Sequence, residues 1–137
     1  MNLEKTLLII KPDAVQRNLI GEIIRRIEAA RFKIANIRHL RMAKSVAEDF
    51  YAVHRGKPFY DELCNYMSSG PIVPMIVEGE HAVAGIRELI GKTNPAEAHP
   101  GTIRYDMAVS LTKNSVHASD STENAAREVK FFFPREE

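Results

Sequence analysis

The sequence has little cysteine, no tryptophan and no long hydrophobic run, and Cys64 is the one cysteine among its 137 residues. A single cysteine excludes an intramolecular disulfide and does not resemble the ligand set of a zinc site. No apolar run approaches the ~20 residues that a membrane-spanning helix needs. Residues 1–5 also lack the charged and then apolar order of a signal peptide. We therefore expect a cytoplasmic protein in a reducing compartment, with no membrane association.

A large charge of either sign is also absent, because 19 Lys and Arg residues offset 18 Asp and Glu residues and leave a net charge of +1. This balance gives no global field that would attract nucleic acid or a membrane surface. Together with the missing tryptophan, it argues against a dedicated nucleic-acid-binding module. The length fits a single domain over residues 1–137, and 45% hydrophobic residues allow a core without disulfides. Any anion site must then be local.

Short apolar runs separated by amphipathic stretches predict alternating strands and helices. Strands are predicted at residues 6–10, 32–42, 72–77 and 117–119, with a possible bulge in the second. Helices are predicted to begin near residues 20, 45, 59, 83 and 121. This order predicts an α/β (α+β) two-layer sandwich of the ferredoxin-like βαββαβ type, with a four-stranded antiparallel sheet and added helices.

Two local features refine the central part of this prediction. Residues 45–48 match a capping box, which predicts that a helix begins there with Val46, Phe50 and Val53 on its buried face. Pro74 lacks the N–H that a strand needs toward a neighbour, so it predicts an edge position or a bulge for its strand.

An irregular segment follows the helix that Gly91 is predicted to end. Residues 91–116 have no regular period, and only residues 94–97 resemble a capped helical turn. Irregular segments of this length in compact domains are usually functional or disordered, and the apolar residues within this one argue against disorder. We therefore expect it to contribute to a site.

The stretch at residues 114–121, NSVHASDS, surrounds one histidine with an amide, hydroxyls and a carboxylate. Neutral imidazole is a nucleophile near pH 7, and free N–H groups at the start of a following helix favour a negatively charged ligand. His117 is thus a candidate phosphate acceptor. The alternative, a helix cap that happens to contain a histidine, is equally consistent with these eight residues.

Four further side chains are of interest, and three of them allow two interpretations. Lys11, at the end of the first predicted strand, is either a solvated terminal lysine or a donor held on a rigid element. Tyr51 is predicted to lie at the border of the buried face of an amphipathic helix. Phe59 is a core residue or an exposed ring for base stacking, and its spacing favours the core. Arg87 either pairs with a helix C-terminus or faces a ligand.

At this point the residues identify a known family. The chain resembles the nucleoside diphosphate kinases essentially end to end. The matching blocks are IKPDAVQR at 10–17, YAVHRGKPF at 51–59, SGP at 69–71, TNP at 93–95, PGTIR at 100–104 and NSVHASDS at 114–121. The last block is similar to the active-site signature of that family.

The resemblance implies a reaction and a set of site residues. The family transfers the terminal phosphate of a nucleoside triphosphate, typically ATP, to nucleoside diphosphates, which maintains NTP and dNTP pools. It does so by a ping-pong mechanism through a phosphohistidine, here on His117, and needs Mg²⁺, held mainly by the nucleotide phosphates. The residues that would surround the phosphates are Lys11, Tyr51, Arg87, Thr93 and Arg104.

The resemblance also implies contacts to the sugar and the base. Asn114 would contact the ribose 3′-hydroxyl, Phe59 would stack on the base, and Leu111 would flank its other side. Ser119 and Glu128 would support the histidine.

The family's assemblies imply a homo-oligomer, either a tetramer or a hexamer. The chain departs from the usual residues at three positions that are not ligands in this scheme, namely Pro74, Tyr105 and Met107. Two competing classes are a non-catalytic nucleic-acid-binding sandwich and a catalytically silent subunit. The near-neutral charge, the absent tryptophan and the lack of paired aromatics on one strand argue against the first. The second is disfavoured because every implied catalytic residue is present.

Overall fold

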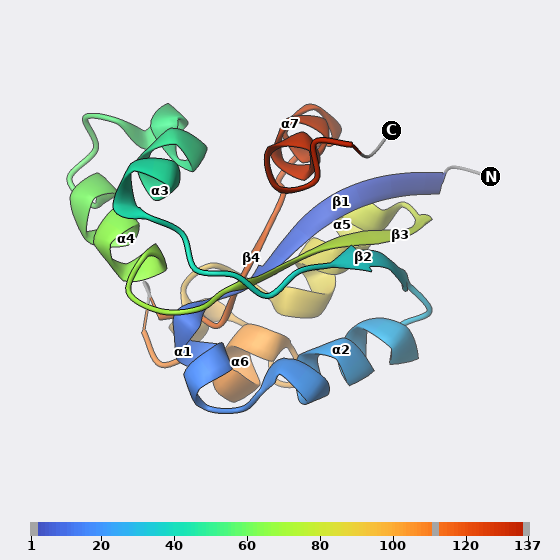
Figure 1. Cartoon of the computed structure of the whole chain (residues 1–137). Coiled ribbons are helices and arrows are strands. Elements are labelled where there is room, and N and C mark those ends of the chain that lie inside the picture. The colour runs from blue at the N-terminus through green and yellow to red at the C-terminus, as the bar shows by residue number, and fades with distance from the viewer. Residues whose placement is uncertain (1–2, 111–112, 136–137) are drawn as a thin grey trace.

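The structure is a computed structural model that describes residues 3–110 and 113–135. Its strands are β1 (Leu3–Ile10), β2 (Lys33–Ile37), β3 (Val73–Glu80) and β4 (Val116–Ala118). Its helices are α1 (Pro12–Gln16), α2 (Ile20–Ala29), α3 (Lys44–Phe50), η1 (Ala52–His54), α4 (Tyr60–Met67), α5 (Ala82–Ile90), η2 (Pro95–Glu97), α6 (Ile103–Met107) and α7 (Thr122–Phe132). Helices cover both faces of one central sheet (Figure 1).

The sheet has the strand order β2-β3-β1-β4, and every neighbouring pair is antiparallel. The longest pairing joins β1 to β3, from Leu3 opposite Glu80 to Ile10 opposite Val73. The short strand β4 pairs with the end of β1, where His117 lies opposite Ile9. The predicted ferredoxin-like arrangement is therefore confirmed, and it brings the candidate histidine beside the end of the first strand.

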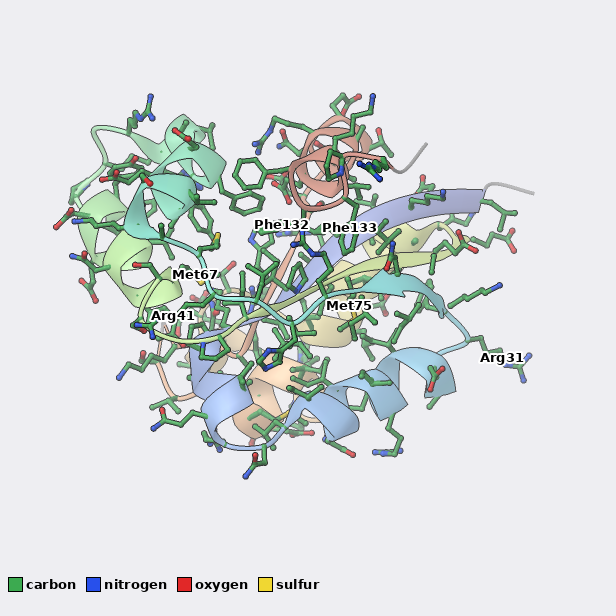
Figure 2. The ribbon with its side chains drawn as sticks, viewed as in Figure 1. Arg31, Arg41, Met67, Met75, Phe132 and Phe133 are labelled. Carbon is green, nitrogen blue, oxygen red and sulfur yellow. The ribbon has the colours of Figure 1, made fainter. Side chains whose placement is uncertain are left out.

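From Thr6 to Ile10, strand β1 is buried on both faces, which explains why residues 7–10 form an unbroken apolar run. Leu8 and Ile10 belong to a core formed with α2, α5 and α6. Leu7 and Ile9 belong to a second core on the opposite face, formed with α3, α4 and α7. Figure 2 labels Met67 among the residues of this second core. The added helices thus complete the sandwich on its second face.

The capping-box prediction at residues 45–48 is wrong. Helix α3 begins at Lys44, its N-cap is Ala43, and no side chain caps it. The α-helix also ends at Phe50, and the chain continues as the 3₁₀ turn η1, so the predicted face does not extend to Val53. Phe50 is buried as expected, but Val46 is 39% exposed and Val53 is 69% exposed.

Pro74 lies in the interior strand β3, opposite Ile9, and not at an edge. Its carbonyl accepts a hydrogen bond from the Arg38 N–H at 3.0 Å, just beyond the end of β2. In an antiparallel strand the N and the carbonyl of one residue face the same neighbour, so the missing donor faces the end of β2 and not β1. The predicted bulge occurs in β2, between Ile34 and Asn36.

The segment after α5 is ordered by two short helices. Gly91 ends α5 with a φ of +88°, and a Cβ at this position would lie 2.6 Å from Thr102 Oγ1. The predicted capped turn is confirmed, because Asn94 accepts a hydrogen bond from the Ala96 N–H at 3.0 Å. Helix α6 was not predicted, since five residues are too few to show a helical period. Of the two unusual residues in α6, Tyr105 is exposed and Met107 is buried.

No helix among the described residues has both the length and the apolar composition needed to cross a membrane.

Candidate active site

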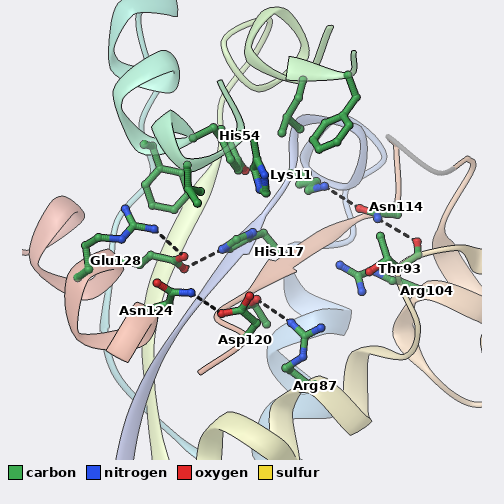
Figure 3. A pocket seen from close by; sticks show the side chains of 17 residues that line it. Lys11, His54, Arg87, Thr93, Arg104, Asn114, His117, Asp120, Asn124 and Glu128 are labelled. Carbon is green, nitrogen blue, oxygen red and sulfur yellow. Dashed lines mark hydrogen bonds and ion pairs between the residues drawn. The ribbon is translucent and has the colours of Figure 1, made fainter. Parts of the chain in front are cut away.

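A cavity of about 460 Å³ opens where the end of β1, strand β4 and the helices α4, α5, α6 and α7 approach one another. Figure 3 shows side chains from these elements converging on it. Its lining residues are Lys11, Phe50, Tyr51, Val53, His54, Phe59, Leu63, Arg87, Thr93, Arg104, Asn114, His117, Ala118, Asp120, Asn124, Arg127 and Glu128.

The imidazole of His117 is held by a carboxylate and by two aromatic rings. Its Nε2 lies 2.8 Å from Glu128 Oε1. The rings of Phe50 and Tyr51 meet it edge-on, with centroid separations of 5.5 and 6.0 Å. Because the carboxylate engages Nε2, the proton of the neutral ring belongs on Nε2 and the lone pair on Nδ1. Nδ1 is therefore the nitrogen available for nucleophilic chemistry.

Glu128 comes from α7 and is itself fixed by other side chains. Ser119 Oγ donates to Glu128 Oε1 at 2.8 Å, and Arg127 Nη2 lies 3.3 Å from Oε2. Burial raises the pKa of Glu128, but the hydrogen bonds from His117 and Ser119 outweigh it, and the pKa ends below its ordinary value. Glu128 is therefore a carboxylate at neutral pH, suited to stabilise positive charge on the imidazole.

Three residues that are distant in the sequence are linked by consecutive hydrogen bonds at one wall of the cavity (Figure 3). Lys11 Nζ donates to Asn114 Oδ1 at 2.7 Å, and Asn114 Nδ2 donates to the Thr93 carbonyl at 3.1 Å. Lys11 is only 6% exposed, so the interpretation as a solvated terminal lysine is wrong. Burial and the charge of Arg104 lower the pKa of Lys11 to about 7, although Asp13 acts in the opposite direction.

Two arginines face the same cavity and are anchored by backbone carbonyls. Arg104 donates from Nη1 to Gly91 and from Nη2 to Val116, both at 2.9 Å. Arg87 Nη1 donates to the Ala118 carbonyl at 3.2 Å. Burial, and then the charge of Arg87, lower the pKa of Arg104 to about 10. Carbonyl partners do not neutralise a guanidinium, so the wall retains positive charge for an anion.

The aromatic side of the cavity is built by the turn between α3 and α4. Phe59 is the N-cap residue of α4 and is 46% exposed, so the interpretation of it as a core residue is wrong. Its ring lies 5.2 Å from the His54 ring. Tyr51 is buried, not at a helix edge, and its hydroxyl has no hydrogen-bond partner among the described residues. Burial raises the pKa of Tyr51, so this hydroxyl is a neutral donor in the cavity.

Most of the residues that the sequence singled out thus come together around one cavity. Ser119 does not line it but bonds to Glu128, and Leu111 lies outside the described residues.

Sequence reasoning missed His54, Asn124 and Arg127. Asn124 and Arg127 are three residues apart on α7, so a search for polar residues on one helical face with Glu128 would have found them. Asn124 bonds to Asp120 at 2.6 Å, which lowers the Asp120 pKa, and Arg87 adds to this effect.

Comparison with known proteins agrees with this arrangement. The family model described as "Nucleoside diphosphate kinase" matches residues 4–137. A nucleoside diphosphate kinase from Desulfatibacillum aliphaticivorans is 58% identical over 131 residues, which cover 96% of this chain and 95% of the relative. One from Persephonella marina is 50% identical over 98% of this chain and 96% of the relative. The crystal structure of the Aquifex aeolicus nucleoside diphosphate kinase superposes with a TM-score of 0.94 at 42% identity, covering 96% of this chain and 95% of that one.

Proposed function

The chain belongs to the nucleoside diphosphate kinase family, and we propose that it transfers the terminal phosphate of ATP to nucleoside diphosphates through a phosphohistidine on His117. The observation that carries this proposal is the 2.8 Å contact between His117 Nε2 and Glu128 Oε1 beside a cavity that four cationic side chains line, namely Lys11, Arg87, Arg104 and Arg127. This contact leaves Nδ1 as the nucleophile and gives the developing imidazolium a partner.

The first half-reaction is a displacement at the γ-phosphorus. The Nδ1 lone pair of His117 attacks that atom, and the bond from the γ-phosphorus to the β–γ bridging oxygen breaks in line with the attack. The nucleoside diphosphate leaves with the electrons of the broken bond. The imidazole keeps its Nε2 proton, which remains hydrogen-bonded to Glu128. The second half-reaction is the reverse, with an oxygen of a different diphosphate as the nucleophile.

Charge on the phosphates is stabilised by cations that the fold has already oriented. Lys11, Arg87 and Arg104 line the same cavity as His117. The buried Tyr51 hydroxyl and Thr93 add neutral donors. Since these groups are held before substrate arrives, little reorganisation accompanies the reaction, and one donor of this kind contributes about 3 kcal/mol to lowering the barrier.

We propose Mg²⁺ as the divalent metal. No group of three or more His, Cys, Asp or Glu able to hold a metal occurs within residues 3–110 and 113–135. The two carboxylates of the cavity, Asp120 and Glu128, are hydrogen-bonded to Asn124 and to His117. This donor set fits Mg²⁺, which keeps several waters and binds through substrate phosphates. When bound, the ion supplies charge neutralisation on the phosphates.

The sugar and base are held by contacts that do not read the identity of the base. Asn114 is oriented by Lys11 and Thr93, which supports its role toward the 3′-hydroxyl. Phe59 offers an exposed ring for stacking, and Leu111 is proposed to flank the base from the other side. Stacking on an aromatic ring tolerates any base. We therefore propose that the protein accepts a broad range of nucleotides as substrates and that it maintains NTP and dNTP pools.

We further propose that residues 1–137 form one domain, that the protein acts in the cytoplasm, and that it assembles into a homo-oligomer, either a tetramer or a hexamer. Light scattering coupled to size exclusion distinguishes these two assemblies by mass.

The reaction is tested by incubating the protein with γ-labelled ATP and Mg²⁺ and then adding a panel of unlabelled diphosphates. We expect stoichiometric label on the protein that is labile in acid and stable in base, followed by its transfer to ADP, GDP, CDP, UDP and their deoxy forms. Transfer that proceeds only when both nucleotides are present, without a labelled protein, would contradict the double displacement.

The role of Phe59 is tested by Phe59→Ala. We expect the nucleotide KM to rise at least fivefold, because stacking on one ring contributes about 1–3 kcal/mol, while kcat changes less. Steady-state kinetics with ATP and TDP measures both constants. Leu3→Ala, which removes an exposed apolar side chain remote from the cavity, is the control. An unchanged KM in Phe59→Ala would remove Phe59 from the nucleotide site.

A further inference from the structure

A buried hydrogen-bonded cluster lies behind the cavity and joins three elements that are distant in the sequence. We call it the Asp13 cluster, and its members are Asp13 of α1, Tyr66 of α4 and Ser115 of the loop before β4. The Tyr66 hydroxyl donates to Asp13 Oδ1 and accepts from the Asp13 N–H at 2.8 Å. Ser115 Oγ donates to Asp13 Oδ2 at 3.4 Å. Asp13 and Ser115 are almost fully buried, and none of the three lines the cavity.

Ser115 adopts a strained backbone conformation two residues before His117. Its φ is +75°, and across it the Val116 N–H donates to the Asn114 carbonyl at 2.9 Å. A hydrogen bond from residue i to i+2 around a central residue of this φ forms the rare type of γ-turn. Side chains disfavour this region, so surrounding contacts must hold such a residue in place.

The Asp13 cluster supplies those contacts and connects them to the cavity. The Lys11 N–H donates to the Ser115 carbonyl at 2.9 Å, while Ser115 Oγ bonds to Asp13. The turn at Ser115 sets the direction of Asn114 on one side and of the strand carrying His117 on the other. Lys11 and Asn114 then meet through their side chains at 2.7 Å. The strained turn therefore lies at the junction of the residues that face the ribose and the phosphates.

A purely local role for the cluster explains only part of this geometry. Asp13 lies in the first turn of α1, where its N–H has no partner within the helix, and the Tyr66 hydroxyl satisfies that donor. Such capping requires neither the contact to Ser115 nor a side chain from α4 that donates to the carboxylate. Burial, and then Asp13, raise the pKa of Tyr66, so this hydroxyl remains protonated and able to donate.

We propose that Asp13 and Tyr66 are positioning residues that hold the strained turn at Ser115 and so aim Asn114 and Lys11 at the nucleotide bound beside His117. This inference rests on the proposed function. It assigns the two side chains a role in the reaction although neither touches the substrate.

The test compares ATP with 3′-deoxy-ATP as phosphate donors in Tyr66→Phe, using single-turnover labelling of His117. The rate with ATP is expected to fall about tenfold to a hundredfold, because small displacements of positioned groups have effects of this size. The rate with 3′-deoxy-ATP, which lacks the hydroxyl that Asn114 would contact, is expected to fall less. The ratio of the two rates therefore drops, and this ratio is independent of the fraction of folded protein.

Two controls separate positioning from general stability. Tyr60→Phe removes another hydroxyl on α4, one that donates to the Glu48 carbonyl at 3.0 Å, and should keep the parental ratio. Asn114→Ala should abolish the discrimination that the cluster is proposed to support. If Tyr66→Phe keeps the parental ratio, the inference is overturned.

A pair of substitutions at Ser115 tests the turn itself. Ser115→Ala and Ser115→Gly both remove the hydroxyl, but only glycine adopts a positive φ without strain. We expect Ser115→Ala to lose discrimination about tenfold and Ser115→Gly to lose much less. Equal loss in both variants contradicts the proposed role of strain. If the parent chain itself is not labelled at His117, the proposed function fails; if the parent is labelled and discriminates but the variants match it, only the positioning inference fails.

Discussion

Replacing His117 by alanine is expected to abolish both labelling of the protein by ATP and phosphate transfer to diphosphates, by at least about four orders of magnitude. Alanine leaves the cations and the aromatic rings of the cavity in place but removes the only proposed acceptor of the phosphate. Nucleotide binding should therefore persist while turnover disappears. Rapid-quench labelling measures the first reaction, and fluorescence titration with a labelled diphosphate measures binding.

The exposed His39 offers the matched control, because His39→Ala removes an imidazole remote from the cavity and should retain parental rates. A His117→Ala protein that still becomes labelled in an acid-labile form would move the nucleophile to another residue. Loss of nucleotide binding along with labelling would instead indicate that the variant has lost the cavity, and circular dichroism checks that the fold is retained.

Replacing Lys11 by methionine is expected to reduce kcat/KM about a hundredfold. Lys11 is buried beside Asn114 and Arg104, so its ammonium is largely withdrawn from water at the place proposed to bind phosphate. Removing one such preoriented donor raises the barrier by about 3 kcal/mol. Lys44→Met, which removes an exposed lysine paired with Asp61 at 3.0 Å, is the control and should retain parental kinetics.

The same residue predicts the pH dependence of the reaction. Burial and Arg104 lower the pKa of Lys11 to about 7, while Asp13 limits this decrease. Lysine is charged in its protonated form, so the charge that phosphate needs is present below this pKa and is lost as the pH rises through it. We expect kcat/KM, which reports the free enzyme, to decline as the pH increases above about 7.

The decline should vanish in Lys11→Met, since no group then titrates at that position. It should also begin at higher pH in kcat than in kcat/KM, because bound phosphate favours the charged lysine. If kcat/KM of the parent chain is constant from pH 6 to about 9, the predicted loss of activity through deprotonation of Lys11 is contradicted.

Much of the fold follows from local patterns. The apolar run of β1, the apolar stripe of α2 and the polar start of α7 are each visible in a short stretch of sequence, and a strand or helix occurs at each of these places as predicted. The predictions that the structure contradicts concern residues whose environment depends on a neighbouring strand or on where a helix ends. Pro74 is tolerated in an interior strand because β2 ends beside it. Val53 is exposed because α3 stops at Phe50, and an apolar stripe does not show where a helix ends. Phe59 is exposed at the N-cap of α4, outside the regular turns of that helix.

By itself, the sequence determined the family, the order of the strands and of the longer helices, and the types of side chain available for chemistry, because these depend on short-range patterns and on a specific stretch around His117. Only the tertiary structure decided which imidazole nitrogen is engaged, that Lys11 is buried, and that a strained turn at Ser115 is held by Asp13. The burial of Lys11 and the contacts of the turn depend on residues far apart in the chain, such as Lys11 and Asn114, which are separated by 103 positions. The contact between His117 and Glu128 joins strand β4 to helix α7. Local propensity does not report burial or contacts at such separations, because both arise only when the sheet brings distant segments together.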